Sequence, residues 1–314
     1  QYLDVFTLES PDAYLNQQVN VWLKRQLSLG KTWGRLYGKG FRDVMQDITA
    51  FVSFDPTLAR ERILYALTYQ YEDGNPIRMF EPNFRFPYND GGVWITGAML
   101  SYLHESGDFD ILKEELSYLK GDSYESASWA DAFVTEPYVA GKRKDSVLKH
   151  IQAAIDYLIG CRGARNLVLW RGGDWNDSLN SAGRQGKGES VWLSIATVKA
   201  IGELQEILML VGGYEEEIAK YEAAKNDLKQ AIEKHGKVGD QYIYGINDNG
   251  ELIGGEDRIF LNPQSWAVLG NIAERDVLEK AMDSVEEKTP HHYCFQQLCN
   301  EIFLALTTSH LVSF

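Results

Sequence analysis

Apolar residues recur at helical spacing along most of the chain, and this periodicity is the main structural signal in the sequence. It predicts nine helices, separated by short segments rich in glycine, polar residues and aromatic residues. Their approximate ranges are 11–27, 56–67, 94–103, 109–119, 147–158, 190–210, 215–234, 263–273 and 275–285. Further short helices would bring the number to about ten.

Several of these segments begin with a recognisable helix start. Ser10-Pro11-Asp12 and Asp55-Pro56 each combine a capping residue with a proline suited to the first turn. Asp145 is a further candidate cap, for the helix that begins near Val147. The segment 190–210 is apolar on more than one face, so we expect it to lie deep in the fold.

Strand signals are few. Two short apolar runs, 242–244 and 252–253, flank Asn247-Asp248-Asn249-Gly250 and predict one small hairpin. Consecutive helices joined by polar loops favour an all-α toroid, in which inner and outer helices alternate and the loops gather at one end. No linker rich in proline or serine marks an internal domain boundary.

Composition and charge limit the functions and partners that the chain can have. The formal net charge of −14 argues against nucleic acid as a partner and against binding to an anionic membrane. No apolar stretch is long enough to span a bilayer, and residues 1–20 lack the pattern of a signal peptide. The three cysteines do not form a disulfide framework, so a cytoplasmic location is expected.

The segment richest in chemistry is Arg171-Gly172-Gly173-Asp174-Trp175-Asn176-Asp177-Ser178-Leu179-Asn180. Its glycines and polar residues predict a loop that directs Asp177 into a cleft, with Trp175 as a wall. A carboxyl group beside an indole loses hydration, which raises its pKa and suits a general acid. The alternative is that Asp174 or Asp177 only caps a turn or a helix.

Two further segments bear on the site. Gly186-Lys187-Gly188 precedes the long apolar helix, but it lacks the ending of a phosphate-binding P-loop and is a weak nucleotide signal. The segment 41–47 places Arg42, Gln46 and Asp47 close together on one helical face. Such side chains either form an ion pair or bind vicinal sugar hydroxyls.

These motifs, together with Asn262-Pro263-Gln264-Ser265-Trp266-Ala267, occur in an order that resembles the cellobiose phosphorylase family, from about Pro11 to Glu286. The family includes β-1,2-glucan phosphorylases and the corresponding module of cyclic β-1,2-glucan synthases. The resemblance implies an (α/α)6 barrel and inverting phosphorolysis of a β-glycoside to an α-sugar-1-phosphate. Inorganic phosphate would be a co-substrate, an oligosaccharide or disaccharide the substrate, and no cofactor is expected.

By matching position, the resemblance implies that Asp177 is the general acid and that Trp175, Arg42 and Asp47 hold the sugar whose bond is cleaved. Weaker expectations for binding substrate, lining the pocket or supporting it fall on Gln46, Asp90, Asn176 and Glu189. The phosphate would replace the base-activated water of an inverting hydrolase, so a second catalytic carboxylate is not required.

The chain departs from the family pattern at both ends. The N-terminal β-sandwich usual in the family is not seen, and residues 290–314 do not resemble the family. We therefore expect a catalytic module at residues 1–289, with a barrel and phosphate site incomplete at the C-terminal end, followed by an atypical tail. In that tail, His291, His292, Cys294 and Cys299 form a weak candidate zinc cluster; the alternative, which we favour, is a tail without metal.

Two other functions stay open. An inverting hydrolase would need a second carboxylate about 6.5–9.5 Å from Asp177, for which Asp47 and Glu189 are the candidates. A degenerate fragment would bind sugar without turnover. A homodimer is also left open as a partner.

Overall fold

The computed structural model describes residues 6–32, 38–124 and 138–289, and this part of the chain is mostly helical. The α-helices are α1 (Ala13–Gln17), α2 (Lys24–Thr32), α3 (Phe41–Phe51), α4 (Pro56–Leu67), α5 (Val93–Ser106), α6 (Val147–Gly160), α7 (Val191–Val211), α8 (Glu215–His235), α9 (Leu261–Leu269) and α10 (Arg275–Lys288). None of these helices is long and apolar enough to cross a membrane.

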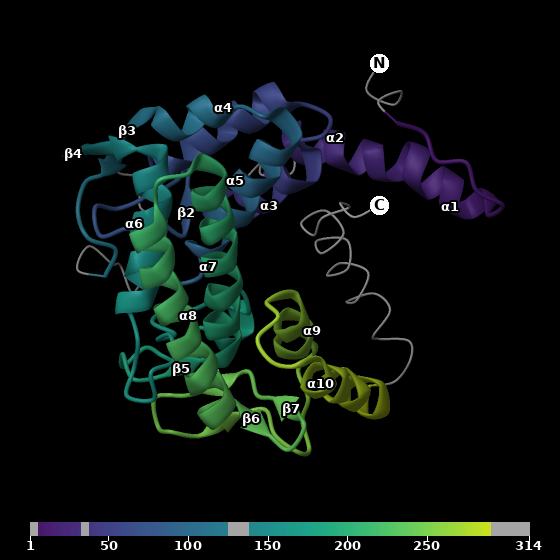
Figure 1. Ribbon diagram of the computed structural model, residues 1–314, viewed down its shortest axis with the longest axis vertical. Coiled ribbons are helices and arrows are strands. Elements are labelled where there is room, and N and C mark those ends of the chain that lie inside the picture. The colour runs from purple at the N-terminus through teal and green to yellow at the C-terminus, as the bar shows by residue number, and fades with distance from the viewer. Residues whose placement is uncertain (1–5, 33–37, 125–137, 290–314) are drawn as a thin grey trace.

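Helices α3 to α10 form two layers. The odd-numbered helices contact one another in sequence, α3 with α5, α5 with α7 and α7 with α9. The even-numbered helices pack against them from outside, with α4 on α3 and α5, α6 on α5 and α7, α8 on α7, and α10 on α9. In Figure 1 this double layer curves from α3 and α4 at the top to α9 and α10 at the bottom. The alternation agrees with the expected pairing of inner and outer helices.

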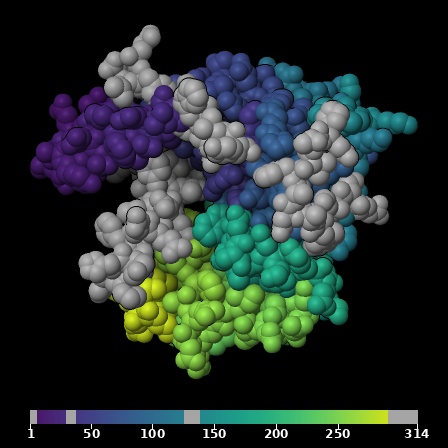
Figure 2. All heavy atoms as spheres, turned by 180° about the vertical axis from the view of Figure 1, so that it is seen from behind, coloured from purple at the N-terminus to yellow at the C-terminus, as the bar shows by residue number. Residues whose placement is uncertain are grey.

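The first helix stands apart from these layers. A π-helical segment, Gln18–Leu23, joins α1 to α2, so one helix runs from Ala13 to Thr32. Figure 2 shows it standing out from the side of the molecule. Its cap is Asp12, whose carboxylate accepts the amide N–H groups of Tyr14 and Leu15, and Pro11 precedes the helix.

Several predicted helix starts are confirmed. Asp55 caps α4, and Pro56 occupies its first turn, where a missing N–H costs nothing. The expected long apolar helix is α7, whose buried residues lie on all sides because α5, α6, α8 and α9 surround it. Its cap is Ser190, whose hydroxyl accepts the N–H of Leu193 at 3.0 Å.

The predicted helix at 109–119 is wrong. A 3-10 helix, Phe109–Lys113, is followed by strand β3 (Glu115–Leu119), which pairs with β4 (Ala140–Ser146). The partner strand lies more than twenty residues away, so local periodicity did not reveal it. The cap of α6 is Ser146 instead of Asp145, because Asp145 accepts a hydrogen bond from Tyr118.

The prediction of one small hairpin is confirmed only in part. Strands β8 (Gly245–Ile246) and β9 (Leu252–Ile253) do pair around the predicted turn, but Tyr242 belongs to β7 (Gln241–Tyr242), which pairs with β6 (Lys237–Val238). Strand β5 (Glu189–Ser190) adds to β8, and β1 (Lys39–Gly40) pairs with β2 (Met79–Phe80). These short ladders join the loops at the ends of the inner helices.

Aromatic rings fill the space beneath these loops. Trp170 and Trp192 are fully buried, and the ring of Tyr244 stacks near both, with centroid distances of 5.5 and 6.4 Å. Gly245 makes this packing possible, since a Cβ atom at this position would lie 2.4 Å from the Trp170 ring. The loop end of α7 therefore rests on a rigid aromatic cluster.

We expect Gly245→Ala to destabilise the protein by about 1–3 kcal/mol, because the added methyl group overlaps a buried ring that has no room to move. The matched control is Gly202→Ala in the middle of α7, where no neighbouring atom lies within 4 Å of the new Cβ. This control should be neutral or gain about 0.5–1 kcal/mol. Urea unfolding measures both, and equal effects of the two substitutions would contradict the packing described.

Candidate active site

The site lies where three inner helices begin. Arg42 is in the first turn of α3, Asp90 lies three residues before α5, and Ser190 caps α7. The loop that precedes α7 carries Asp174 and Asp177. Helix N-termini are favourable places for negative charge, which suits three carboxylates gathered at this end of the fold.

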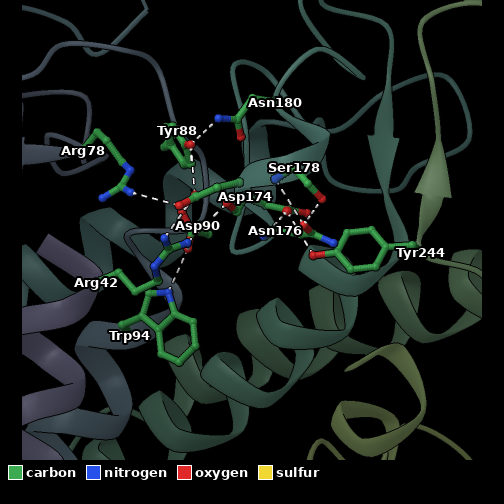
Figure 3. A network of polar contacts seen from close by, with 11 residues as sticks. Arg42, Arg78, Tyr88, Asp90, Trp94, Asp174, Asn176, Ser178, Asn180 and Tyr244 are labelled. Atoms are coloured by element: carbon green, nitrogen blue, oxygen red, sulfur yellow. Dashed lines mark hydrogen bonds and ion pairs between the residues drawn. The ribbon is translucent and has the colours of Figure 1, made fainter. Parts of the chain in front are cut away.

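Arg42 joins these segments. Its Nη1 lies 2.9 Å from a carboxylate oxygen of Asp90 and donates to the backbone carbonyl of Asp174 at 3.2 Å, while Nη2 lies 3.3 Å from Asp177. Burial alone lowers the pKa of this guanidinium, but Asp90 and Asp177 outweigh that effect and raise it. Figure 3 shows the three segments converging on this side chain, with the Trp94 indole donating to Asp90 from below.

Asp177 is the exposed carboxylate of the three. It begins a short 3-10 helix, Asp177–Leu179, and 58% of its side-chain surface is accessible to solvent. One oxygen accepts the hydroxyl of Tyr88 at 3.0 Å, and the other lies 3.6 Å from the guanidinium of Arg78. The carboxylate is therefore held by named partners while one side stays open to a ligand.

The expected loss of hydration at Asp177 beside Trp175 is not observed. Trp175 is half-buried and packs against the core, with its ring centroid 6.3 Å from that of Trp192. Because its indole is turned toward the core cluster, it leaves most of the Asp177 side chain exposed. The surroundings of Asp177 are set by two arginines and a tyrosine instead.

Asp174 differs from Asp177 although only two residues separate them. Its side chain is fully buried and accepts hydrogen bonds from Ser190 Oγ at 2.7 Å, from Tyr244 Oη at 3.1 Å and from the Asn176 amide at 3.0 Å. Burial raises the pKa of Asp174 to about 7, although these donors partly oppose the shift. Asp90 adds to the rise through its nearby charge.

Three residues of the site were not predicted from the sequence. Arg78 and Tyr88 come from the long segment between α4 and α5, and Asn180 donates to the Tyr88 hydroxyl. The Arg78 guanidinium also lies over the Tyr88 ring, 4.5 Å from its centroid. Burial, followed by the charge of Asp177, raises the pKa of Tyr88 to about 12, so its hydroxyl remains a donor at neutral pH.

The glycines of the motif allow this close packing. Gly173 pairs with Tyr88 in an isolated parallel bridge, and its carbonyl accepts the Asn89 amide at 2.9 Å. A Cβ atom on Gly173 would lie 2.6 Å from the Asn180 side chain and 2.9 Å from the Tyr88 ring. Only glycine lets the loop that carries Asp177 lie directly on the Tyr88 segment.

The other predicted residues take different positions. Gln46 and Asp47 lie on the next turn of α3 and are half-buried, so they remain candidates to line the site. Asn176 caps the 3-10 helix, with its side chain accepting from Ser178. Glu189 is fully buried, and Arg165 occupies both of its oxygens through a backbone amide and a guanidinium, each at 2.8 Å. Glu189 therefore supports a loop and is not placed to activate a water molecule.

The glycine-rich loop at 183–188 wraps around Asp248. The Asp248 carboxylate accepts the backbone N–H groups of Gln185, Lys187 and Gly188 at 2.8–3.0 Å. These groups are consequently unavailable to cradle a phosphate, which agrees with the weak nucleotide signal. Between this loop and the hairpin lies an open cavity of about 240 Å³, lined by Ser178, Leu179, Ser181, Ala182, Gln185, Asn247, Asp248, Asn249 and Ile253.

Comparisons with known proteins show the family of the chain. The model of the glycosyl hydrolase 94 superfamily catalytic domain matches residues 1–300. Solabiose phosphorylase from Paenibacillus borealis is 36% identical over 91% of this chain, and cyclic beta-(1,2)-glucan synthase NdvB from Rhizobium meliloti is 33% identical over 90%. A rhamnosidase from Klebsiella oxytoca, solved with rhamnose bound, has a similar fold, with a TM-score of 0.53 at 14% identity over 86% of this chain and 48% of the rhamnosidase.

The matched region is only part of each curated relative. It covers 35% of the solabiose phosphorylase and 10% of the glucan synthase. Residues 290–314, including the candidate zinc cluster of the tail, lie outside the described part of the structure.

Asp174 gives the site a pH-dependent stability. Because the pKa of this carboxyl is raised from 3.8 to about 7, its stabilising contribution is complete below pH 4 and is lost as the pH rises through 7. Asp174→Asn cannot ionise, so we expect the variant to gain stability relative to the native protein between pH 5 and pH 8, by at most about 4 kcal/mol.

Urea unfolding at the two pH values measures this difference. Asp108→Asn is a control without a pH effect in this window, because a hydrogen bond from Tyr102 and the cation of Arg60 lower the pKa of Asp108, so this carboxyl group is ionised in the folded and the unfolded protein at both pH values. The difference in stability between that variant and the native protein should therefore be the same at pH 5 and pH 8. If the difference in free energy of unfolding between the native protein and Asp174→Asn did not change with pH, this would contradict the burial of an ionisable Asp174.

Proposed function

The chain belongs to the glycosyl hydrolase 94 superfamily, and from this premise we propose that it is the helical catalytic module of an inverting glycoside phosphorylase. Such an enzyme transfers a glycosyl group from a β-glycoside to phosphate and releases an α-sugar-1-phosphate. Relatives named as phosphorylases, including a cellobionic acid phosphorylase from Neurospora crassa that is 28% identical, support this reaction class.

The observation that carries the proposal is the position of Asp177. Among the three aspartates that gather around Arg42, Asp90 and Asp174 are buried and already accept hydrogen bonds from protein groups, whereas Asp177 is mostly exposed. Asp177 is therefore the carboxyl group able to reach a glycosidic oxygen and protonate it. Arg42 and Arg78 would exchange their contact with Asp177 for sugar hydroxyls when substrate binds.

The surrounding residues would bind the sugar and leave a path for phosphate. Half-buried Trp175, Gln46 and Asp47 would hold the sugar whose bond is cleaved, through stacking and hydrogen bonds to vicinal hydroxyls. The alternating helices α3 to α10 would form part of an (α/α)6 barrel that keeps the loops at one end. Phosphate would attack the anomeric carbon from the face opposite Asp177, so no second carboxylate is needed to activate it.

A hydrolase would use water and a second carboxylate on the opposite face of the sugar. Glu189 cannot serve in that role, because its carboxylate is fully buried against Arg165. No observation in the described part of the chain favours hydrolysis over phosphorolysis.

We expect Asp177→Asn to lower turnover by at least about a thousandfold while sugar affinity changes by less than threefold. The amide keeps the shape and polarity of the carboxyl but cannot donate a proton to the leaving oxygen. Steady-state kinetics and calorimetric sugar binding measure the two effects. A variant that retained normal turnover would show that another group protonates the glycosidic oxygen.

The reaction class is tested in the direction of synthesis. The protein is mixed with α-glucose-1-phosphate and with glucose, cellobiose, sophorose or N-acetylglucosamine, and phosphate release is followed. We expect release that depends on one acceptor, which would also identify the acceptor class. A folded protein that releases no phosphate with any acceptor, yet binds an oligosaccharide, would contradict the proposal and favour a sugar-binding fragment.

A further inference from the structure

Asp174 has a feature that its position beside the general acid does not explain. A fully buried carboxylate normally has a cation for a partner, but the three groups that donate to Asp174 are all neutral. The Arg42 guanidinium, the nearest positive group of the network, donates to the backbone carbonyl of Asp174 instead of to its side chain. The carboxylate is thus used as an acceptor for three rigidly placed donors.

Two of these donors belong to the core of the fold. Ser190 is the cap of α7, and its hydroxyl accepts the Leu193 amide while it donates to Asp174. Tyr244 is buried and its ring packs against the buried rings of Trp170 and Trp192, so its hydroxyl has little freedom to follow a moving loop. Figure 3 shows Tyr244 reaching Asp174 from the side opposite Arg42.

The third donor belongs to the loop itself. The amide of Asn176 closes a turn onto the Asp174 side chain, which fixes the backbone between Asp174 and Asp177. Both ends of this short segment contact the guanidinium of Arg42. Arg42 donates to the backbone carbonyl of Asp174 at 3.2 Å and lies 3.3 Å from the carboxylate of Asp177. Loss of the hydrogen bonds to the Asp174 side chain would therefore free the turn that carries these two contacts of Arg42.

We propose that Asp174 is a positioning residue, which transmits the rigid placement of Ser190 and Tyr244 through the 174–177 turn to the carboxyl group of Asp177. The kinetic consequence rests on the proposed function, whereas the structural link does not. The ionisable or charged groups that face this unit are Asp90, Arg42, Tyr244 and Asp177. The ionised carboxylate of Asp174 accepts hydrogen bonds from all three donors. Protonation of one carboxylate oxygen removes part of this acceptor capacity and loosens the turn.

Tyr244→Phe tests the link with little change in packing, since only the hydroxyl is lost. We expect kcat to fall by about ten- to a hundredfold with KM changed less than threefold, because the reacting group is displaced and the sugar contacts remain. The acidic limb of the kcat profile should move to higher pH, because the Tyr244 hydroxyl lowers the pKa of Asp174. In Asp174→Asn that limb should disappear.

The matched control is Tyr118→Phe. Tyr118 is as deeply buried as Tyr244 and donates to Asp145 at 3.2 Å, but it lies in β3, where its ring stacks on that of His150 in α6. We expect its kcat, KM and pH profile to match those of the native protein. Equal losses of kcat in Tyr118→Phe and Tyr244→Phe, or an unshifted pH profile of kcat in Tyr244→Phe, would show that Asp174 has only a structural role and would overturn the proposal.

A second measurement needs no turnover. The Trp94 indole N–H donates to Asp90, whose charge interacts with that of Asp174, so its nuclear magnetic resonance signal reports on Asp174. After assignment by Trp94→Phe, the signal should titrate near neutral pH in the native protein, titrate at higher pH in Tyr244→Phe, and not titrate in Asp174→Asn. Identical titrations in all three would contradict the positioning role, even in a protein that lacks phosphorylase activity.

Discussion

The structure depends on the pairing of one buried charge, that of Arg42. A guanidinium in this position has lost its water and must be satisfied by protein groups. Those groups come from two segments that are distant from Arg42 in sequence, namely the segment before α5, which carries Asp90, and the loop before α7, which carries Asp174 and Asp177. The ion pairs therefore fix the loop end of the helical layers as well as the candidate catalytic group.

Three aspartates meet around this cation with three different surroundings. Asp90 is buried and paired with Arg42 and Trp94, Asp174 is buried among neutral donors, and Asp177 is exposed. Residue type alone does not distinguish them, but burial and hydrogen bonding do. This division leaves Asp177 as the carboxyl group that is open to a ligand, whereas the carboxyl groups of Asp90 and Asp174 are buried among their hydrogen-bond donors.

The sequence predicted those parts of the fold that depend on local signals. The long helix α7, the charged helix α8 and the cap at Asp55 follow from periodicity and capping, which act within a few residues. The strands β3 and β4, and the contacts of Arg78 and Tyr88 with Asp177, were missed for the opposite reason. Tyr88 lies 89 residues from Asp177, and no spacing rule connects the two. The motif at 171–177 identified the loop, but only the packing of Trp175 against the core showed that Asp177 is exposed.

A general acid at position 177 must face the bond that is cleaved. The most direct test is a crystal structure of Asp177→Asn with an intact β-linked disaccharide. We expect the glycosidic oxygen within about 3 Å of the side chain at position 177. A disaccharide whose glycosidic oxygen faces a different carboxyl group, or one that binds away from the Arg42 network, would contradict this account of the site.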